Sequence, residues 1–421
     1  MNMNLMHFKK QVRNRKDQKI YESKPFGSAI KFKRKEMNMT LEEGAEGICS
    51  VSYLSKLENN LIEPGVRFIP LLIARFKLED VFDQDYEHYQ RHLIEIKQCL
   101  FEGTKPLEDM PAFYGKRKDY QALLIKMGYY VLHDEGDEAS KSIHDLRVYI
   151  PNLSQDEFGL FTLLVGMLLY QDHKYSDGYE LLLLAPKFDD LEQKIVLLLL
   201  KYRLFCAFRM NKISEVLNNY PVYVNMTVDI EKYDLLQDMR NHYVQFEANY
   251  KNPEDMEKIL GKMSTLSQEV KDFILAKSMF FHGEYEDVIK ASKPYYRRNS
   301  DWLVLYLMSL DYAGKHEDII YLLDHYDEIT DVCKTAKVLI SHLRHKHKSD
   351  KTQLLNYLRR EILGIKHLSD EYQVLDYLMM DAQHLFSKHQ HYKEAVQVTT
   401  HFIPRLKTLG RAEHTMHIES N

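Results

Sequence analysis

Two short helices joined by a tight turn are predicted between residues 40 and 59, and this pattern constrains the fold of the chain more than any other. The Thr40 hydroxyl can accept the free amide hydrogen of Glu43, and the Glu43 carboxylate can reach back to the Thr40 amide, so a helix is predicted to begin there. The Ser50 hydroxyl can cap a second helix over about residues 51–59. The pattern therefore predicts a helix-turn-helix unit.

The second helix of this unit is amphipathic. Leu54 and Leu57 lie three residues apart and are predicted to face the core. The side chains left on or near its outer face are Ser52, Tyr53, Ser55 and Lys56. Such groups can contact base edges or phosphates. Together with further helices over about residues 27–37 and 66–76, this order of helices predicts a DNA-binding domain.

Positive charge is concentrated at the N-terminal end of the chain. Residues 1–36 contain eleven Lys or Arg and three acidic residues, a net charge of +8, in a chain whose total is −5. A basic end on an acidic body can hold phosphates locally. For the basic arm over residues 1–25 two interpretations stay open, a solvated charge run and an arm that enters the DNA minor groove.

The segment from Gly27 to Leu78 resembles the Xre/Cro-type repressor domain. The run over residues 46–60 is similar to that of the RRNPP group of peptide-pheromone regulators, which includes PlcR, NprR and Rgg-type proteins. The resemblance implies that Arg34 pairs with Glu58 in a structural role. It also implies that Ser50, Ser52, Tyr53 and Lys56 face DNA, and the predicted DNA-binding set further includes Arg34, Lys35 and Thr40.

One departure from this resemblance is Gly44, because the family usually has an apolar residue there, most often Leu. A glycine inside a helix costs roughly 1 kcal/mol relative to Ala. We therefore expect this small domain to be less stable than its relatives.

Composition limits what the rest of the chain can be. With 421 residues and 45% hydrophobic content, the chain can form a large core and two or three domains. It has no signal-peptide pattern and no apolar run of ~18 residues, so we expect a cytoplasmic protein that does not span a membrane. Four well-separated cysteines favour reduced thiols over zinc or disulfides. Few glycines and prolines, and no convincing strand, predict an all-α fold.

Similar polar turns recur between apolar helices in the rest of the chain. Aligning them gives matching positions at residues 175, 213, 253, 285, 316 and 392, in steps of 38, 40, 32, 31 and 76, the last of which covers two units. The period, with Phe281–Ile289 as its best copy, resembles the tetratricopeptide repeat, and Gly166 and Ala276 suit its close helix crossings. The resemblance implies a right-handed α-solenoid of such helix pairs over residues 83–410, followed by a tail over residues 411–421.

The concave face of such a solenoid is lined by the first helix of each pair and can bind an extended peptide. Counting back from the turns puts Asn241, Gln245 and Asn249 on one face of one helix, four residues apart. Their amides both donate and accept, which suits pairing with a peptide backbone. Positive charge for a carboxylate is added by Lys201, Arg209 and Lys277. A solvated helix face explains any single one of these residues equally well, whereas the cluster favours the peptide.

Other residue clusters give weaker signals. Histidines at positions 342, 345 and 347, and at 384, 389 and 391, lie among Lys and Arg, and we interpret them as solvated side chains rather than metal ligands. The tyrosines are interpreted as packing residues. No Walker loop, HExxH, GxSxG or Gly-rich dinucleotide motif is present. The sequence therefore predicts neither an enzyme nor a cofactor or metal site.

These observations predict an all-helical transcription regulator in two parts. Residues 26–82 are predicted to bind double-stranded operator DNA, and residues 83–410 to bind a short signalling peptide, as in quorum sensing, and to form a homodimer. One alternative is a scaffold whose repeats grip and regulate a partner protein, with DNA binding secondary or constitutive. A further alternative is constitutive repression in which the repeats serve only dimerisation.

Overall fold

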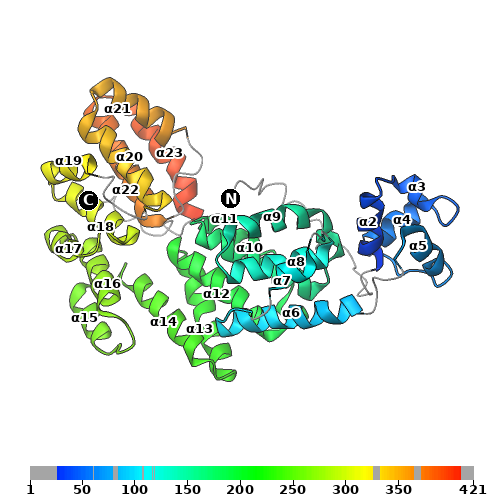
Figure 1. Cartoon of the computed structure of the whole chain (residues 1–421). Coiled ribbons are helices and arrows are strands. Elements are labelled where there is room, and N and C mark those ends of the chain that lie inside the picture. The colour runs from blue at the N-terminus through cyan, green and yellow to red at the C-terminus, as the bar shows by residue number, and fades with distance from the viewer. Residues whose placement is uncertain are drawn as a thin grey trace. The chain divides into compact units, whose positions relative to one another are not determined.

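The computed structural model describes residues 26–59, 61–78, 84–106, 109–115, 117, 119–325, 332–364 and 371–408 (Figure 1). Every regular element in these ranges is a helix, which confirms the predicted all-α fold. The predicted basic arm over residues 1–25 and the predicted tail over residues 411–421 lie outside the described residues.

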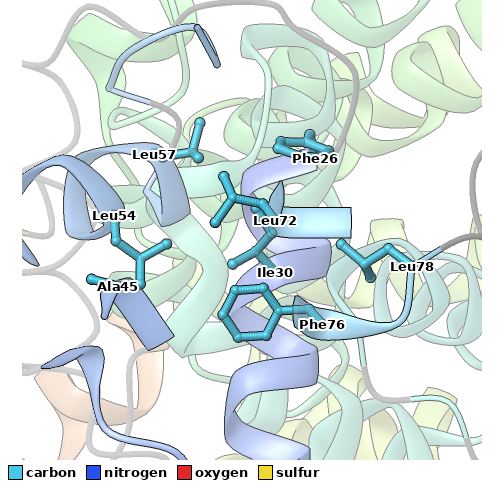
Figure 2. Close-up of a cluster of buried hydrophobic side chains, with 8 residues drawn as sticks. All are labelled: Phe26, Ile30, Ala45, Leu54, Leu57, Leu72, Phe76 and Leu78. Carbon is cyan, nitrogen blue, oxygen red and sulfur yellow. The ribbon is translucent and has the colours of Figure 1, made fainter. Parts of the chain in front are cut away.

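Four helices form the head, the name used below for residues 26–78. They are α2 (Phe26–Glu36), α3 (Leu41–Ala45), α4 (Val51–Glu58) and α5 (Ile69–Phe76). Figure 2 shows its core, in which buried apolar side chains of all four helices meet, together with Leu78. Leu54 and Leu57 of α4 belong to this core, as the amphipathic pattern predicts, so the opposite face of α4 is left for solvent or a ligand.

Local side-chain bonds fix where α3 and α4 begin. The Glu43 amide donates to Thr40 Oγ1 at 3.2 Å, and the Thr40 amide donates to Glu43 Oε2 at 2.6 Å, so the predicted capping box is confirmed. The Tyr53 amide donates to Ser50 Oγ at 3.2 Å, which caps α4 as predicted. Thr40 therefore fixes the start of α3, and Ser50 holds the turn between the two helices at the start of α4.

Gly44 lies buried where α3 meets the other helices of the head. A Cβ atom at this position would lie 3.0 Å from Arg34 Cδ, 3.1 Å from Leu54 Cδ2 and 3.2 Å from Phe76 Cζ. Glycine therefore lets α3 approach α2, α4 and α5 closely. A leucine at Gly44 would overlap these side chains, which gives this departure from the family pattern a packing reason.

The matching positions of the predicted repeats are each the first residue of a helix. The helices that follow the turns are α11 (Tyr175–Leu182), α13 (Ile213–Asp229), α15 (Pro253–Gly261), α17 (Tyr285–Ser292), α19 (His316–Asp324) and α23 (Tyr392–Thr408). The helices that precede them are α10 (Gln155–Gln171), α12 (Gln193–Arg209), α14 (Tyr233–Glu247), α16 (Gln268–Phe281), α18 (Ser300–Tyr312) and α22 (Tyr372–Lys388). The alignment thus located these turns to the residue.

Most of these turns share one backbone conformation. The residue two positions before the second helix has a positive φ at His173 (57°), Asn211 (55°), Gly283 (81°), Gly314 (68°) and Gln390 (65°). The next amide then bonds back five residues, for example from Glu284 to the Met279 carbonyl at 2.9 Å. This bond satisfies a carbonyl at the end of the first helix and reverses the chain, as in a Schellman turn.

One further pair was not found in the sequence, and a second lies within the 76-residue step of the alignment, which covers two units. One is α8 (Tyr120–Leu132) with α9 (Gly136–Leu146), whose turn has the same form around Asp134 (φ 61°). The other is α20 (Lys334–Lys348) with α21 (Lys351–Tyr357), which follows a different rule because Asp350 caps α21 directly. The remaining helical elements are α6 (Gln84–Glu102), α7 (Met110–Tyr114), η1 (Arg147–Asn152), η2 (Phe188–Asp190) and the π-helical η4 (Leu358–Ile362).

The helices fall into two compact units. Unit 1 comprises residues 1–172 and 177–203, and unit 2 comprises residues 173–176 and 204–421. In unit 2 the first helices α14, α16, α18, α20 and α22 contact one another in chain order, and α15, α17 and α19 each contact the first helix of the following pair. In unit 1, α10 and α11 approach so closely that a Cβ on Gly166 would lie 2.6 Å from Leu182 Cδ2.

A buried polar network joins α18, α20 and α22. The Lys346 ammonium donates to Asp311 and to Asp381 at 2.6 Å each. His342 Nε2 lies 2.8 Å from Asp381 Oδ2, and His347 Nε2 lies 3.0 Å from Asp311 Oδ1. Although burial opposes ionisation, His347 and Lys346 hold the pKa of Asp311 well below its usual range. The interpretation of solvated histidines is wrong for these two, because their side chains are buried.

The other expectations from the sequence concern membranes, thiols and metals. Across the described ranges, no helix combines the length and the apolar composition needed to cross a membrane. All four cysteines are free thiols, and Cys99 and Cys206 are buried. In the same ranges, no group of three or more His, Cys, Asp or Glu side chains has an arrangement that could hold a metal ion.

The turn geometry predicts opposite effects for two glycines of unit 2. Gly283 has a positive φ, so Gly283→Ala should lower the free energy of unfolding by about 1 kcal/mol. Gly261 ends α15 with ordinary backbone angles and open space around it, so Gly261→Ala should be neutral or stabilising by up to ~1 kcal/mol. Thermal unfolding of the two variants measures the difference, and equal shifts would contradict the assigned turn.

Candidate functional site

The exposed face of α4 and its surroundings carry most of the predicted DNA-binding set. Ser52 and Lys56 are exposed on α4, and Ser50 is exposed at its N-cap. Thr40 and Lys35 are exposed on the flanking segments. Since Leu54 and Leu57 hold the opposite face of α4 in the core, these hydroxyl and ammonium groups are presented to solvent on a fixed support. Such groups can bond to phosphates and to base edges.

Tyr53 has a structural role that its position on α4 did not predict. Its hydroxyl accepts the Gly65 amide hydrogen at 2.7 Å, and its ring lies 4.8 Å from the ring of Phe68. The side chain is half-buried as a result. Tyr53 therefore holds the loop after α4 against the head, and part of its surface is left for contact with DNA.

Arg34 pairs with Glu58 as the family resemblance implies. Arg34 Nε lies 2.6 Å from Glu58 Oε1, and Nη2 lies 2.9 Å from Oε2, while Nη1 donates to the Met39 carbonyl at 2.8 Å. The bond to Glu58 raises the pKa of Arg34, and Glu58 is only 2% exposed. The guanidinium thus ties α2 to the end of α4 within the head, which is a different role from the DNA contact predicted for it.

The basic face of α2 is only partly free. Lys33 and Lys35 extend from its last turn, where positive charge also suits the helix dipole, and Lys33 Nζ donates to Glu36 Oε2 at 2.8 Å. Lys31, by contrast, is half-buried, and its ammonium donates to Asn59 Oδ1 at 2.8 Å. Burial, followed by repulsion from Lys35, lowers the pKa of Lys31 to about 8.

A second candidate site lies in unit 2 around Arg209 and Lys277. Arg209 Nη2 lies 3.3 Å from Asp301 Oδ2, and Lys277 Nζ donates to the Gln245 carbonyl at 3.2 Å. Burial, followed by repulsion from Arg209, lowers the pKa of Lys277 to about 8. Attraction by Arg209 lowers the pKa of Asp301. Two predicted cations therefore stand close enough to interact, and a carboxylate of the chain already neutralises one of them.

The three amide side chains predicted to bind the peptide do not all lie on one helix. Asn241 and Gln245 lie on α14 and are half-buried, but α14 ends at Glu247, so Asn249 belongs to the turn that follows. Asn249 Nδ2 donates to Asn211 Oδ1 at 3.3 Å, and Asn249 Oδ1 is buried without a hydrogen-bond partner among the described atoms. The expectation of three amides on one helix face is therefore wrong for Asn249.

Several residues around this site were missed in the sequence. Asn211 is 5% exposed and accepts from Asn249 and from the Tyr250 hydroxyl. His173 Nδ1 lies 3.8 Å from Glu371 Oε1. Asn211 and His173 occupy the same position of the recurring turn, which is the one signal that could have drawn attention to them. Lys201 lies on the part of α12 that belongs to unit 1 and is half-buried there.

The remaining amide of the predicted set is engaged locally. Asn241 Oδ1 accepts from Gln237 Nε2 at 2.8 Å, one turn earlier on α14. The Gln245 side chain is half-buried on the same helix, and its backbone carbonyl bonds to Lys277. Within unit 2, the structure thus brings together Arg209 and Lys277 and, one helix turn apart, Asn241 and Gln245.

Comparison with known proteins supports the assignment of the head. A family model described as helix-turn-helix matches residues 30–79, which run from Ile30 in α2 to just beyond α5. The chain matches no curated protein and no solved structure. With the capped turn, the single core and the exposed polar face of α4, this match identifies residues 30–79 as an Xre-type helix-turn-helix domain of a DNA-binding transcription regulator.

Proposed function

We propose that this chain is a cytoplasmic homodimeric regulator whose head binds operator DNA and whose tetratricopeptide-like repeats, stacked as a right-handed solenoid, bind a short signalling peptide. The observation that carries the DNA-binding part is the outward face of α4, where Ser50, Ser52 and Lys56 are exposed while Leu54 and Leu57 anchor the helix. Phosphate contacts from the basic groups would position the head, and contacts of α4 with base edges would select the sequence.

The peptide-binding part of the proposal is supported by the charges and amides of unit 2. Arg209 and Lys277 offer positive charge to a peptide carboxylate, which would compete with Asp301 for Arg209. Asn249 Oδ1 is buried without a described hydrogen-bond partner, and it would accept a peptide N–H group if the side chain turned outward. Asn241 and Gln245 continue the polar surface along α14 and could bond to the backbone of an extended peptide whatever its side chains.

Regulation in this proposal is a coupling between two sites. If the peptide favours one of two dimer conformations and DNA favours one of them, each ligand changes the affinity of the other by the same factor. Titration of operator with and without synthetic peptides from reading frames beside the gene tests this directly. Identical operator curves at saturating peptide would remove the peptide switch and leave a regulator whose DNA binding is constitutive.

A second candidate function is a scaffold that binds a partner protein. Large apolar side chains are exposed on α13 and at the start of α14, with Leu217 61% and Tyr233 63% exposed. Such groups are typical of protein contact surfaces when they gather on one face. Recovery of a stoichiometric protein partner that is lost on Leu217→Ser would support this function, and peptide binding without such a partner would oppose it.

Lys56 should contribute to DNA binding through its charge. Lys56→Ala should weaken operator binding at low salt. If the ammonium contacts one phosphate, the variant should also show a weaker salt dependence, with the magnitude of the slope of log K against log salt reduced by about 0.9. Lys141→Ala is the matched control, because it removes the same charge from an exposed position on α9. An unchanged slope and affinity for Lys56→Ala would mean that α4 does not face DNA.

Peptide binding should depend on pH through Lys277. Its pKa of about 8 means that the amine is mostly charged at pH 7 and mostly neutral at pH 9, so affinity for a carboxylate should fall by up to about ten-fold over this range. Lys277→Arg keeps the charge and should bind with little change over the same interval. Calorimetric titration at several pH values measures both, and parallel curves would exclude Lys277 from the carboxylate contact.

A further inference from the structure

We propose that Asn152, which lies outside the head, is a positioning residue for DNA binding, because it ties the end of the recognition helix α4 to the 3-10 helix η1. The proposal rests on the proposed function, since it concerns how the head is held when it reads DNA. All residues involved belong to unit 1.

The central contact is a buried hydrogen bond over a long sequence separation. Asn152 Nδ2 donates to the carbonyl of Glu58, the last residue of α4, and Asn152 is 2% exposed. The last carbonyls of a helix have no partner within the helix and must be satisfied from elsewhere. Here the donor comes from a residue 94 positions later in the chain, beyond the family match at residues 30–79.

A second set of contacts surrounds this bond. Lys31 Nζ donates to the Val148 carbonyl at 3.2 Å as well as to Asn59 Oδ1. The ammonium groups of Lys31 and Lys35 lie 5.6 Å and 5.8 Å from the centre of the Tyr149 ring, which is a distance suited to cation–π attraction. The Tyr149 side chain is 5% exposed. Val148, Tyr149 and Asn152 thus contact both α2 and the C-terminal end of α4.

These contacts leave the surface proposed to bind DNA exposed. Ser50, Ser52 and Lys56 remain exposed, because the bond from η1 goes to the backbone carbonyl of Glu58 at the C-terminal end of α4 and covers none of these side chains. The Arg34–Glu58 pair joins α4 to α2, so a displacement of η1 would move the head as one body rather than α4 alone. In a dimeric regulator, the orientation of each head sets the distance between the two DNA half-sites that it can read. Asn152 therefore contributes to selection of half-site spacing.

Asn152→Asp tests this role with little change in shape. A carboxylate cannot donate to the Glu58 carbonyl and repels it, so the contact should be lost. The full chain would be tested on a duplex selected from a randomised pool by the wild-type protein, with the spacing of its half-sites changed in one-base-pair steps. The variant should bind the preferred spacing about ten-fold more weakly, the effect of losing about one buried hydrogen bond, and should discriminate less among spacings.

Two controls separate this role from general damage. Binding to a single half-site should stay unchanged in the variant, because the reading face is intact. Asn219→Asp on α13 should behave like wild type, since among the described residues Asn219 Nδ2 bonds within its own helix, to the Glu215 carbonyl. A variant that weakens single-half-site binding equally would show damage to the head and would overturn the positioning role.

The remaining outcomes also decide the question. If the wild-type chain selects no duplex, the proposed function fails before Asn152 is tested. If the wild-type chain prefers one spacing and folded Asn152→Asp prefers it equally, the positioning role is rejected while DNA binding stands. Should Asn152→Asp fail to fold, Tyr149→Leu removes the aromatic face for Lys31 and Lys35 but keeps apolar volume, and unchanged spacing preference in that variant would reject the role as well.

Discussion

The structure depends throughout on satisfying the polar backbone groups at the ends of many short helices. Each helix leaves free amides at its start and free carbonyls at its end, and burying these groups unpaired costs free energy. The chain meets this requirement in a few repeated ways. Hydroxyl and carboxylate caps start α3, α4 and α10, residues such as Gly283 close turns in the left-handed conformation, and the Asn152 amide satisfies the end of α4.

Features set by neighbouring residues could be predicted from the sequence. The Thr40–Glu43 capping box, the start of α4 after Ser50, and the helix starts at the aligned turns all depend on residues within one or two turns of each other. The Arg34–Glu58 pair was predictable through the family resemblance, although the residues lie 24 positions apart. The turn between α20 and α21 was not among the aligned turns, although the 76-residue step between residues 316 and 392 allowed for one more unit there.

Features that depend on contacts between distant segments could not be predicted. Burial of His342 requires α20 and α22 to meet, and the pairing of Arg209 with Asp301 joins residues 92 positions apart. Asn249 follows the spacing of a helix face, yet α14 ends two residues earlier. The Asn152–Glu58 bond shows the same limit, because nothing in either local sequence indicates that the two segments meet.

The Arg209–Asp301 pair also bears on how a bound peptide could act in the proposed function. Asp301 lies in the first turn of α18, where the helix dipole favours its negative charge. A ligand carboxylate that takes over Arg209 would exchange one ion pair for another, so the net gain in affinity from charge is small, whereas the arrangement around Asp301 must change. Because α18 contacts α16, α17, α19 and α20, such a change at its start has a direct path to neighbouring helix pairs. The site would then act mainly by moving Asp301 rather than by binding tightly.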